Sequence, residues 1–229
     1  VGHSNGGLLA KALAAALGAD APKYIDRIIM VGTPQWGTPS DIGAMLHGDG
    51  GTIGPLGIIS NGSDTRAVAA TMPGAYGLLP SPAYFAHIAD PVVTFNTGGM
   101  ISGNFATSFG STLTSFSALA NFITDSVGLD ASAGAPSDLR TPLALSNALV
   151  DKAVATHDVL DAWTPHADIT VTAIAGWGQD TTKAYTYSTV SKVVCTTQMF
   201  SSQKVCADAP QLSHMPVLTQ DGDNTVVST

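Results

Sequence analysis

The sequence contains no glutamate, and charged side chains make up only 11% of its 229 residues, well below the roughly 25% of an average soluble domain. All 17 acidic residues are therefore Asp, and against 9 Lys and Arg they leave a net charge of -8. A surface this acidic offers no electrostatic footprint for nucleic acid or for an anionic membrane. We therefore expect no nucleic-acid partner and no electrostatic attraction to an anionic membrane.

Long apolar runs and cysteines are scarce as well. No stretch approaches the roughly 18–20 apolar residues that span a bilayer, so no transmembrane helix is predicted. The 2 cysteines have no zinc-like spacing with His, so we expect no metal site. The chain does contain 45% hydrophobic residues, 24 Gly and 13 Pro, a composition that supports a real core and excludes coiled-coil and collagen-like folds.

The chain begins inside a motif, with no Met, signal peptide or polar lead-in before it. No targeting segment can be read from such a start. We therefore expect a fragment of a longer protein.

The motif is Gly-His-Ser-Asn-Gly at residues 2–6, which fits the G-x-S-x-G nucleophile elbow. Such an elbow holds its Ser in a strained turn between a strand and a helix, and its two glycines remove Cβ atoms that would collide there. We take Ser4 as the candidate nucleophile and the backbone N–H of Asn5, at the helix N-terminus, as a candidate oxyanion donor. A simple Gly-Ser loop is the structural alternative.

The residues after the elbow predict a parallel sheet. Residues 5–17 are expected to form an Ala/Leu-rich helix that Gly18 ends, and residues 24–32 a buried strand rich in β-branched residues. The apolar stripe of the helix is expected at Leu8, Leu9, Ala12, Leu13, Ala16 and Leu17. An elbow, a helix and a buried strand in this order are typical of a parallel α/β sheet with right-handed crossovers.

Between residues 40 and 165 the composition shifts to Gly, Ser, Thr, Ala and Pro in short segments. Two helices are predicted there, at residues 112–127 and 142–163, each with an apolar face suited to packing on a core. A long insertion between two sheet strands is typical of a cap over an active site. The alternative is a helical subdomain without that role.

A strand returns at residues 168–176, and residues 183–206 alternate in the manner of antiparallel strands. With the turn centred on residues 200–201, Cys195 and Cys206 lie directly opposite each other, at a spacing near the short end of the disulfide range. Two cysteines in register and a weakly charged Ser/Thr-rich surface favour an exported protein. Two free thiols are the alternative.

Residues 221–227 place acidic side chains in a Gly/Asn turn just after an apolar segment. In isolation such a run is more often a turn than an active site. A calcium loop is excluded because Thr and Val stand where acidic ligands are required.

Several motifs occur in a defined order along nearly the whole chain. They are GHSNGG at residues 2–7, GTPQWG at 32–37, MPGAYGLLP at 72–80, GWGQDT at 176–181 with Tyr185 and Tyr187, and DGDNTV at 221–226. Together they resemble the lecithin:cholesterol acyltransferase family of α/β-hydrolases, which includes lysosomal phospholipase A2-like enzymes and bacterial lipase-like relatives.

The resemblance implies that Ser4 is the nucleophile and that Asp223 is the triad acid. Asp180 is the runner-up acid, because an Asp shortly after a late strand also fits a hydrolase sheet. The catalytic His of the family lies some tens of residues beyond the acid turn, so we expect it after residue 229.

None of the histidines within the chain suits the role of base. Structural roles are expected for four histidines, His47, His87 and His157 in the insertion and His166 directly at its end. His3 lies too close to Ser4 to reach its hydroxyl, and His214 precedes the acid, against the Ser–acid–His order of α/β-hydrolases.

These observations predict an α/β fold, with a partial α/β-hydrolase sheet from the nucleophile elbow onward at residues 1–39 and 166–229 and a large, mostly helical cap at residues 40–165. The predicted function is a serine acyl hydrolase or acyltransferase on lipid-like esters, working through an acyl-Ser4 intermediate without a cofactor. Its partners would be a lipid or ester substrate and, transiently, a lipid interface. The alternatives are a carboxylesterase or peptidase on the same fold, and a catalytically dead domain that binds lipid or another partner.

Overall fold

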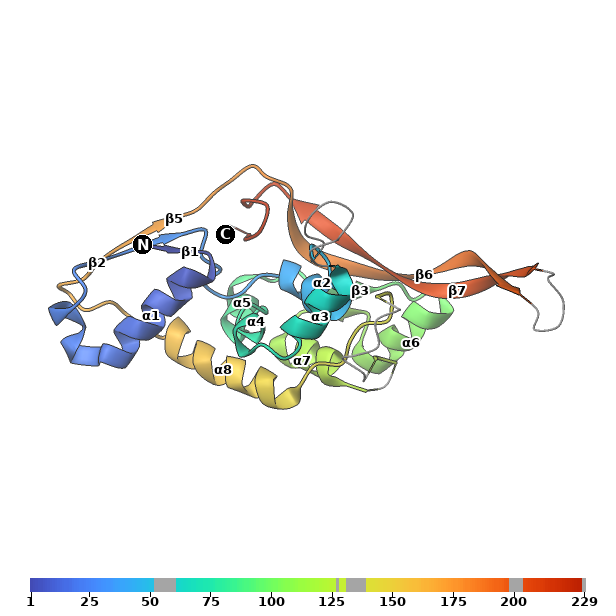
Figure 1. Ribbon diagram of the computed structural model, residues 1–229, viewed down its shortest axis with the longest axis horizontal. Coiled ribbons are helices and arrows are strands. Elements are labelled where there is room, and N and C mark those ends of the chain that lie inside the picture. The colour runs from blue at the N-terminus through green and yellow to red at the C-terminus, as the bar shows by residue number, and fades with distance from the viewer. Residues whose placement is uncertain (52–60, 127, 131–138, 198–203, 228–229) are drawn as a thin grey trace.

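The computed structural model describes residues 1–51, 61–126, 128–130, 139–197 and 204–227. Within these ranges the chain forms a mixed α/β structure with two sheets (Figure 1). One sheet is parallel, in the order β1 (Gly2–His3), β2 (Arg27–Val31) and β5 (Thr170–Ile174). The other has the order β4 (Thr112–Leu113), β3 (Val93–Phe95), β6 (Thr181–Thr197) and β7 (Lys204–Thr219).

The helices lie along one side of the two sheets (Figure 1). They are α1 (Asn5–Leu17), the 3-10 turn η1 (Gly18–Lys23), α2 (Ser40–His47), α3 (Gly62–Ala69), α4 (Pro73–Tyr76), α5 (Pro82–His87), α6 (Met100–Phe109), α7 (Phe116–Thr124) and α8 (Asn147–Asp161). Among the helices of the described ranges, none has the length and apolar run that a bilayer crossing requires.

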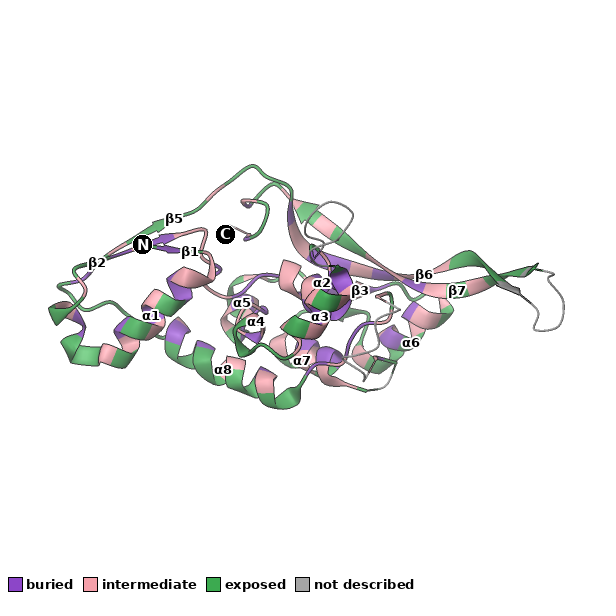
Figure 2. Ribbon diagram, viewed as in Figure 1, coloured by how far each residue is buried: buried purple, intermediate pink, exposed green. Residues whose placement is uncertain are grey.

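The parallel sheet and its first helix follow the prediction. Helix α1 spans the predicted residues 5–17, and β2 pairs in parallel with β1 on one side and β5 on the other. Strand β2 is shorter than predicted and buries only alternate residues, Ile28 and Met30, because α1 covers one face of this sheet. Strand β5 is largely exposed (Figure 2).

The predicted apolar stripe of α1 is wrong in part. The helix buries Gly7, Leu8, Lys11 and Ala14, whereas Leu9 is 66% exposed and Leu13 55% exposed. A stripe as wide as the predicted one cannot all contact three strands, so the buried face is the narrower i, i+4, i+7 row of Gly7, Lys11 and Ala14, together with Leu8.

Both helices predicted in the insertion are shorter than expected. Helix α7 begins only at Phe116, because the Ser115 hydroxyl caps the N–H of Ala118 (3.2 Å) and residues 112–113 pair with β3. Helix α8 begins only at Asn147, because the residues before it are extended and use their backbone elsewhere. The N–H of Leu145, for example, donates to Ile123 O at 2.7 Å.

The larger core joins the second sheet to the helices of the insertion. Phe95 of β3, Phe122 of α7 and Tyr187 of β6 are fully buried there, with ring centroids 5.1–5.7 Å apart. This sheet takes β3 and β4 from residues 40–165 and β6 and β7 from residues 166–229. The proposed boundary between catalytic core and cap stays a prediction, and it passes through this sheet.

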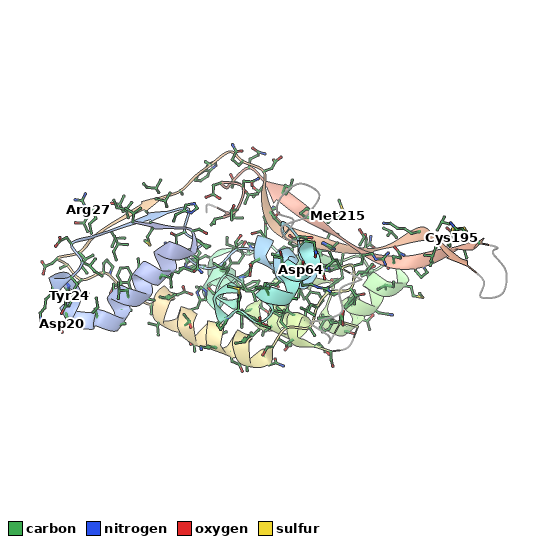
Figure 3. The ribbon with its side chains drawn as sticks, viewed as in Figure 1. Asp20, Tyr24, Arg27, Asp64, Cys195 and Met215 are labelled. Atoms are coloured by element: carbon green, nitrogen blue, oxygen red, sulfur yellow. A yellow bond between two sulfur atoms is a disulfide. The ribbon has the colours of Figure 1, made fainter. Side chains whose placement is uncertain are left out.

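The hairpin of β6 and β7 confirms the predicted antiparallel strands. Pairing runs from Thr181↔Thr219 to Thr197↔Lys204, and Cys195 lies opposite Cys206 and forms a disulfide with it. The far part of the hairpin, with Cys195, extends past the helices (Figures 1 and 3). The predicted turn at residues 200–201 lies outside the described residues.

Candidate functional site

Ser4 lies between β1 and α1 in a strained backbone conformation, with φ 54° and ψ -130°. Positive φ in a residue other than Gly costs about 1–3 kcal/mol and persists only where the surroundings enforce it. Here the Ser4 N–H donates to Val31 O of β2 at 2.9 Å, and Ser4 O accepts the N–H of Gly7 at 3.0 Å. The side chain is thus held at the carboxyl end of the parallel strands.

The glycines around the elbow have different roles. A Cβ on Gly2 would lie 2.5 Å from Gly6 O, so a larger residue is excluded where strand and helix cross. A Cβ on Gly6 would meet nothing within 4 Å, which overturns the expectation that both motif glycines prevent collisions. The crowded position on the helix is Gly7, where a Cβ would lie 2.0 Å from Thr33 Oγ1.

The first turn of α1 leaves backbone N–H groups without partners in the helix, and that of Asn5 follows the nucleophile directly. Such N–H groups stabilise negative charge at a helix N-terminus. The arrangement can therefore supply one donor to an oxyanion on a group bound at Ser4.

The carboxylate of Asp223 lies over the ends of the two neighbouring strands. Its Oδ1 accepts the N–H groups of Thr225 at 3.0 Å and Val226 at 2.8 Å. Its Oδ2 would lie 2.9 Å from a Cβ on Gly32, after β2, and its Cβ 2.6 Å from one on Gly176, after β5. A side chain at Gly32 or Gly176 would therefore keep the Asp223 side chain away from the strand ends.

Ser4 and Asp223 therefore reach the same edge of one sheet. Ser4 follows β1, and Asp223 covers the end of β2, the next strand. Adjacent strands lie about 4.8 Å apart, so the two residues follow or cover neighbouring strand ends. Among the described residues no hydrogen bond reaches the Ser4 hydroxyl or Asp223 Oδ2.

Asp180, the other candidate acid, points elsewhere. Its carboxylate accepts a hydrogen bond from the side-chain amide of Gln220, and its carbonyl accepts one from Asn224 Nδ2 at 3.0 Å. Asp180 thus supports the turn that carries Asp223 and does not lie against the strand ends.

A cavity of about 260 Å³ opens beside Asp223. Its lining is mostly apolar and consists of Met30, Gly32, Thr33, Gln35, Trp36, Gly37, Tyr84, Ala173, Ile174, Ala175, Asp223, Val226 and Val227. Burial raises the pKa of Tyr84 to about 12, so its phenol stays neutral. A cavity of this character suits an apolar group next to a reacting centre.

Motifs far apart in sequence build the wall of this cavity. The N–H of Thr38 donates to Leu78 O and the N–H of Ser81 to Trp36 O, both at 2.8 Å, so the segment after α4 is fixed on the loop after β2. The ring of His87 stacks on Trp36 at a centroid distance of 4.2 Å.

Lys11 is a residue of this region that sequence reasoning missed. It is only 8% exposed, and burial lowers the pKa of its ammonium. Its Nζ donates to Gln35 Oε1 at 3.0 Å, and Gln35 Nε2 in turn contacts Met30 Sδ at 3.3 Å. The signal was present as the lone charge in an Ala/Leu-rich helix.

The histidines of the chain, all within the described residues, make no hydrogen bond to Ser4 or Asp223. His47 contacts Tyr187 Oη and Leu139 O, each at 2.7 Å, and burial lowers its pKa to about 3. The other contacts are His157 with Asp161 and Gly77, His166 with Asp168, His214 with Asp49, and the His87 stack; His3 is exposed. Nor do the described residues contain a group of three or more His, Cys or acidic side chains that could hold a metal ion.

Comparison with known proteins gave a weak similarity to a solved structure. No model of a protein family matches the chain, and no curated protein matches it. A solved structure, the crystal structure of the Tle4–Tli4 complex, aligns with a TM-score of 0.41 and 17% identity. The alignment covers 74% of this chain and 34% of that one, so the chain spans about a third of its length.

Proposed function

We propose that this chain carries the nucleophile and the acid of a serine acyl hydrolase or acyltransferase with an α/β-hydrolase fold. The observation that carries the proposal is the strained elbow of Ser4 at the end of β1, with the carboxylate of Asp223 over the end of the next strand. The order of the motifs along the sequence, from the elbow at residues 2–7 to residues 221–226, supports the same hypothesis.

In the proposed reaction Ser4 Oγ attacks the carbonyl carbon of an ester. A base takes the hydroxyl proton, and the oxygen that becomes negative accepts the N–H of Asn5. The ester C–O bond then breaks, the proton passes to the departing alkoxide, and the acyl group stays on Ser4. Water or an alcohol repeats the sequence in reverse, which regenerates the Ser4 hydroxyl.

Asp223 Oδ2 is proposed to accept a hydrogen bond from the base and to fix its tautomer. The proposal assigns that base to none of the histidines in residues 1–229, because none of them contacts Ser4 or Asp223. The apolar cavity beside Asp223 supports an ester with an apolar acyl or alcohol part, such as a lipid. Carboxylesterase and peptidase activity remain alternatives on the same site.

A second candidate function follows from the same histidines. Without a base, Ser4 and Asp223 would not catalyse turnover of an ester, and the domain would bind lipid or a protein partner instead.

We also propose that the protein is exported, which the disulfide between Cys195 and Cys206 supports, because such bonds persist in oxidising compartments.

Labelling with a fluorophosphonate tests the catalytic proposal. The longest product of the gene that contains this chain should be labelled, Ser4→Ala should abolish labelling, and Asp223→Asn should slow it by about 10⁴-fold while Asp180→Asn leaves it within a few-fold. Equal labelling of Ser4→Ala would show that Ser4 is not the nucleophile. No labelling of any product would favour the binding function.

A further inference from the structure

We infer that the hydroxyl of Thr181 is the positioning group for the acid, holding the turn that aims the Asp223 carboxylate at the strand ends. This inference rests on the proposed function. Thr181 is the first residue of β6 and contacts neither the Ser4 elbow nor the cavity, so it would act only through Asp223.

The contacts of Thr181 make it a fixed link. The residue is fully buried at 0% exposure. Its hydroxyl donates to Gln179 O at 2.9 Å and accepts the N–H of Asn224 at 2.8 Å. A Cβ on Gly222 would lie 2.5 Å from this hydroxyl, so the Gly of the acid motif is what lets the two segments approach.

The residue that Thr181 holds is itself strained. Asn224 has φ 82°, a left-handed conformation that a residue other than Gly keeps only when its surroundings enforce it. Two contacts do so here: the hydrogen bond from its N–H to Thr181, and the one from its side-chain amide to Asp180 O at 3.0 Å.

The strained turn sets the direction of the acid. Asp223 precedes Asn224 directly, and its Oδ1 accepts the N–H groups of the two residues that follow, Thr225 and Val226. On the opposite side Thr38 Oγ1 donates to Thr225 O at 2.8 Å. Loss of the Thr181 hydroxyl would leave the turn held on the β6 side by the Asn224 side chain and by the N–H of Gln179, which donates to Gly222 O at 3.0 Å, and would let Oδ2 move from its place beside Gly32.

The test compares Thr181→Val, which removes the hydroxyl at nearly constant volume, with Thr181→Ser, which keeps it. In the longest gene product, Thr181→Val should lower kcat for a p-nitrophenyl ester by about 100-fold with KM unchanged, and Thr181→Ser should restore most of it. Thr189→Val is the matched control, because the Thr189 hydroxyl accepts N–H groups of Ile101 and Ser102 at the start of α6, away from the acid. It should leave kcat unchanged.

Combination with Asp223→Asn separates this inference from the proposed function. In that background Thr181→Val should cause no further loss of kcat, because the group it positions is already gone. The same 100-fold loss there would overturn the inference. If Asp223→Asn leaves kcat unchanged, the proposed acid is wrong; if it lowers kcat by about 10⁴-fold while Thr181→Val leaves kcat unchanged, only the inference is wrong.

The inference can also be tested on the 229-residue chain without an assay of enzymatic activity. Hydrogen exchange at the N–H groups of Thr225 and Val226, which Asp223 holds, should accelerate by about tenfold or more in Thr181→Val and stay unchanged in Thr189→Val. Unchanged exchange in Thr181→Val would overturn the inference whatever the enzyme does.

Discussion

Two regions of this molecule use polar side chains in opposite ways. One is the carboxyl edge of the parallel sheet, with the elbow and the acid turn. The other is a cluster between α2 and the hairpin, here named the hairpin polar cluster, which consists of His47, Asp49, Tyr185, Tyr187 and His214. In the cluster the rings of His47 and His214 stack at 3.7 Å, His47 contacts Tyr187 at 2.7 Å, and His214 contacts Asp49 at 3.0 Å.

At the sheet edge the polar groups are left open. Thr33 Oγ1 is buried without a hydrogen-bond partner, and among the described residues none is bonded to the hydroxyl of Ser4 or to Oδ2 of Asp223. Buried polar groups in proteins are nearly always paired, so the pairing within the hairpin polar cluster supports a structural role, whereas under the proposed function the open groups of the sheet edge would face the substrate.

Substitution of His47 should show the largest effect on stability. His47→Ala leaves Tyr187 Oη and Leu139 O buried without their partner and opens a cavity, so we expect the free energy of unfolding to fall by about 3 kcal/mol. Urea unfolding measures this, with the exposed His166→Ala as control. Slower fluorophosphonate labelling of Ser4 in the folded variant would contradict the division between the two regions.

The two motif glycines of the elbow should respond in opposite directions. Gly2→Ala drives a Cβ against the backbone of Gly6 and should cost about 2–3 kcal/mol. Gly6→Ala meets open space inside a helix and should stabilise by about 0.5–1 kcal/mol. Thermal unfolding of the two variants measures these changes in stability. Equal losses of stability in both would contradict the packing described for Gly2 and Gly6.

Asp41 lies on α2, the helix that ends at His47 of the hairpin polar cluster. It should make the free energy of unfolding depend on pH. It lies in the first turn of α2, beside Ser40, whose hydroxyl bonds the acid turn at Thr225 O, and its buried Oδ2 has no partner in the described structure. Burial raises its pKa from 3.8 to about 7. The folded state therefore holds a proton that the unfolded state releases, so stability should fall as pH rises from about 4 to 7 and level off above that.

Asp41→Asn should remove this slope, since the amide cannot ionise. Urea unfolding at several pH values measures it, and Asp151→Asn, at an exposed position on α8, should keep the slope. A slope that persists in Asp41→Asn would assign it to other groups.

Sequence reasoning succeeded where local pattern controls structure. The elbow helix ends at Gly18 as expected, residues 170–174 form a strand, and Cys195 faces Cys206, because periodicity and turn residues act over a few neighbouring positions. It failed where partners are distant. The burial of Lys11, the crowding at Gly7 and the shortened α8 all depend on residues from other elements.

The sequence by itself determined the elbow, the acid turn and the alternation of the hairpin, since each is set by side chains within a few residues of one another. Only the tertiary structure decided which carboxylate faces the strand ends. Asp180 and Asp223 were both candidate acids from the sequence, yet only Asp223 lies against Gly32 and Gly176. Those contacts join the ends of β2 and β5 to a segment that returns after the whole hairpin, and packing between such distant segments leaves no local pattern in the chain.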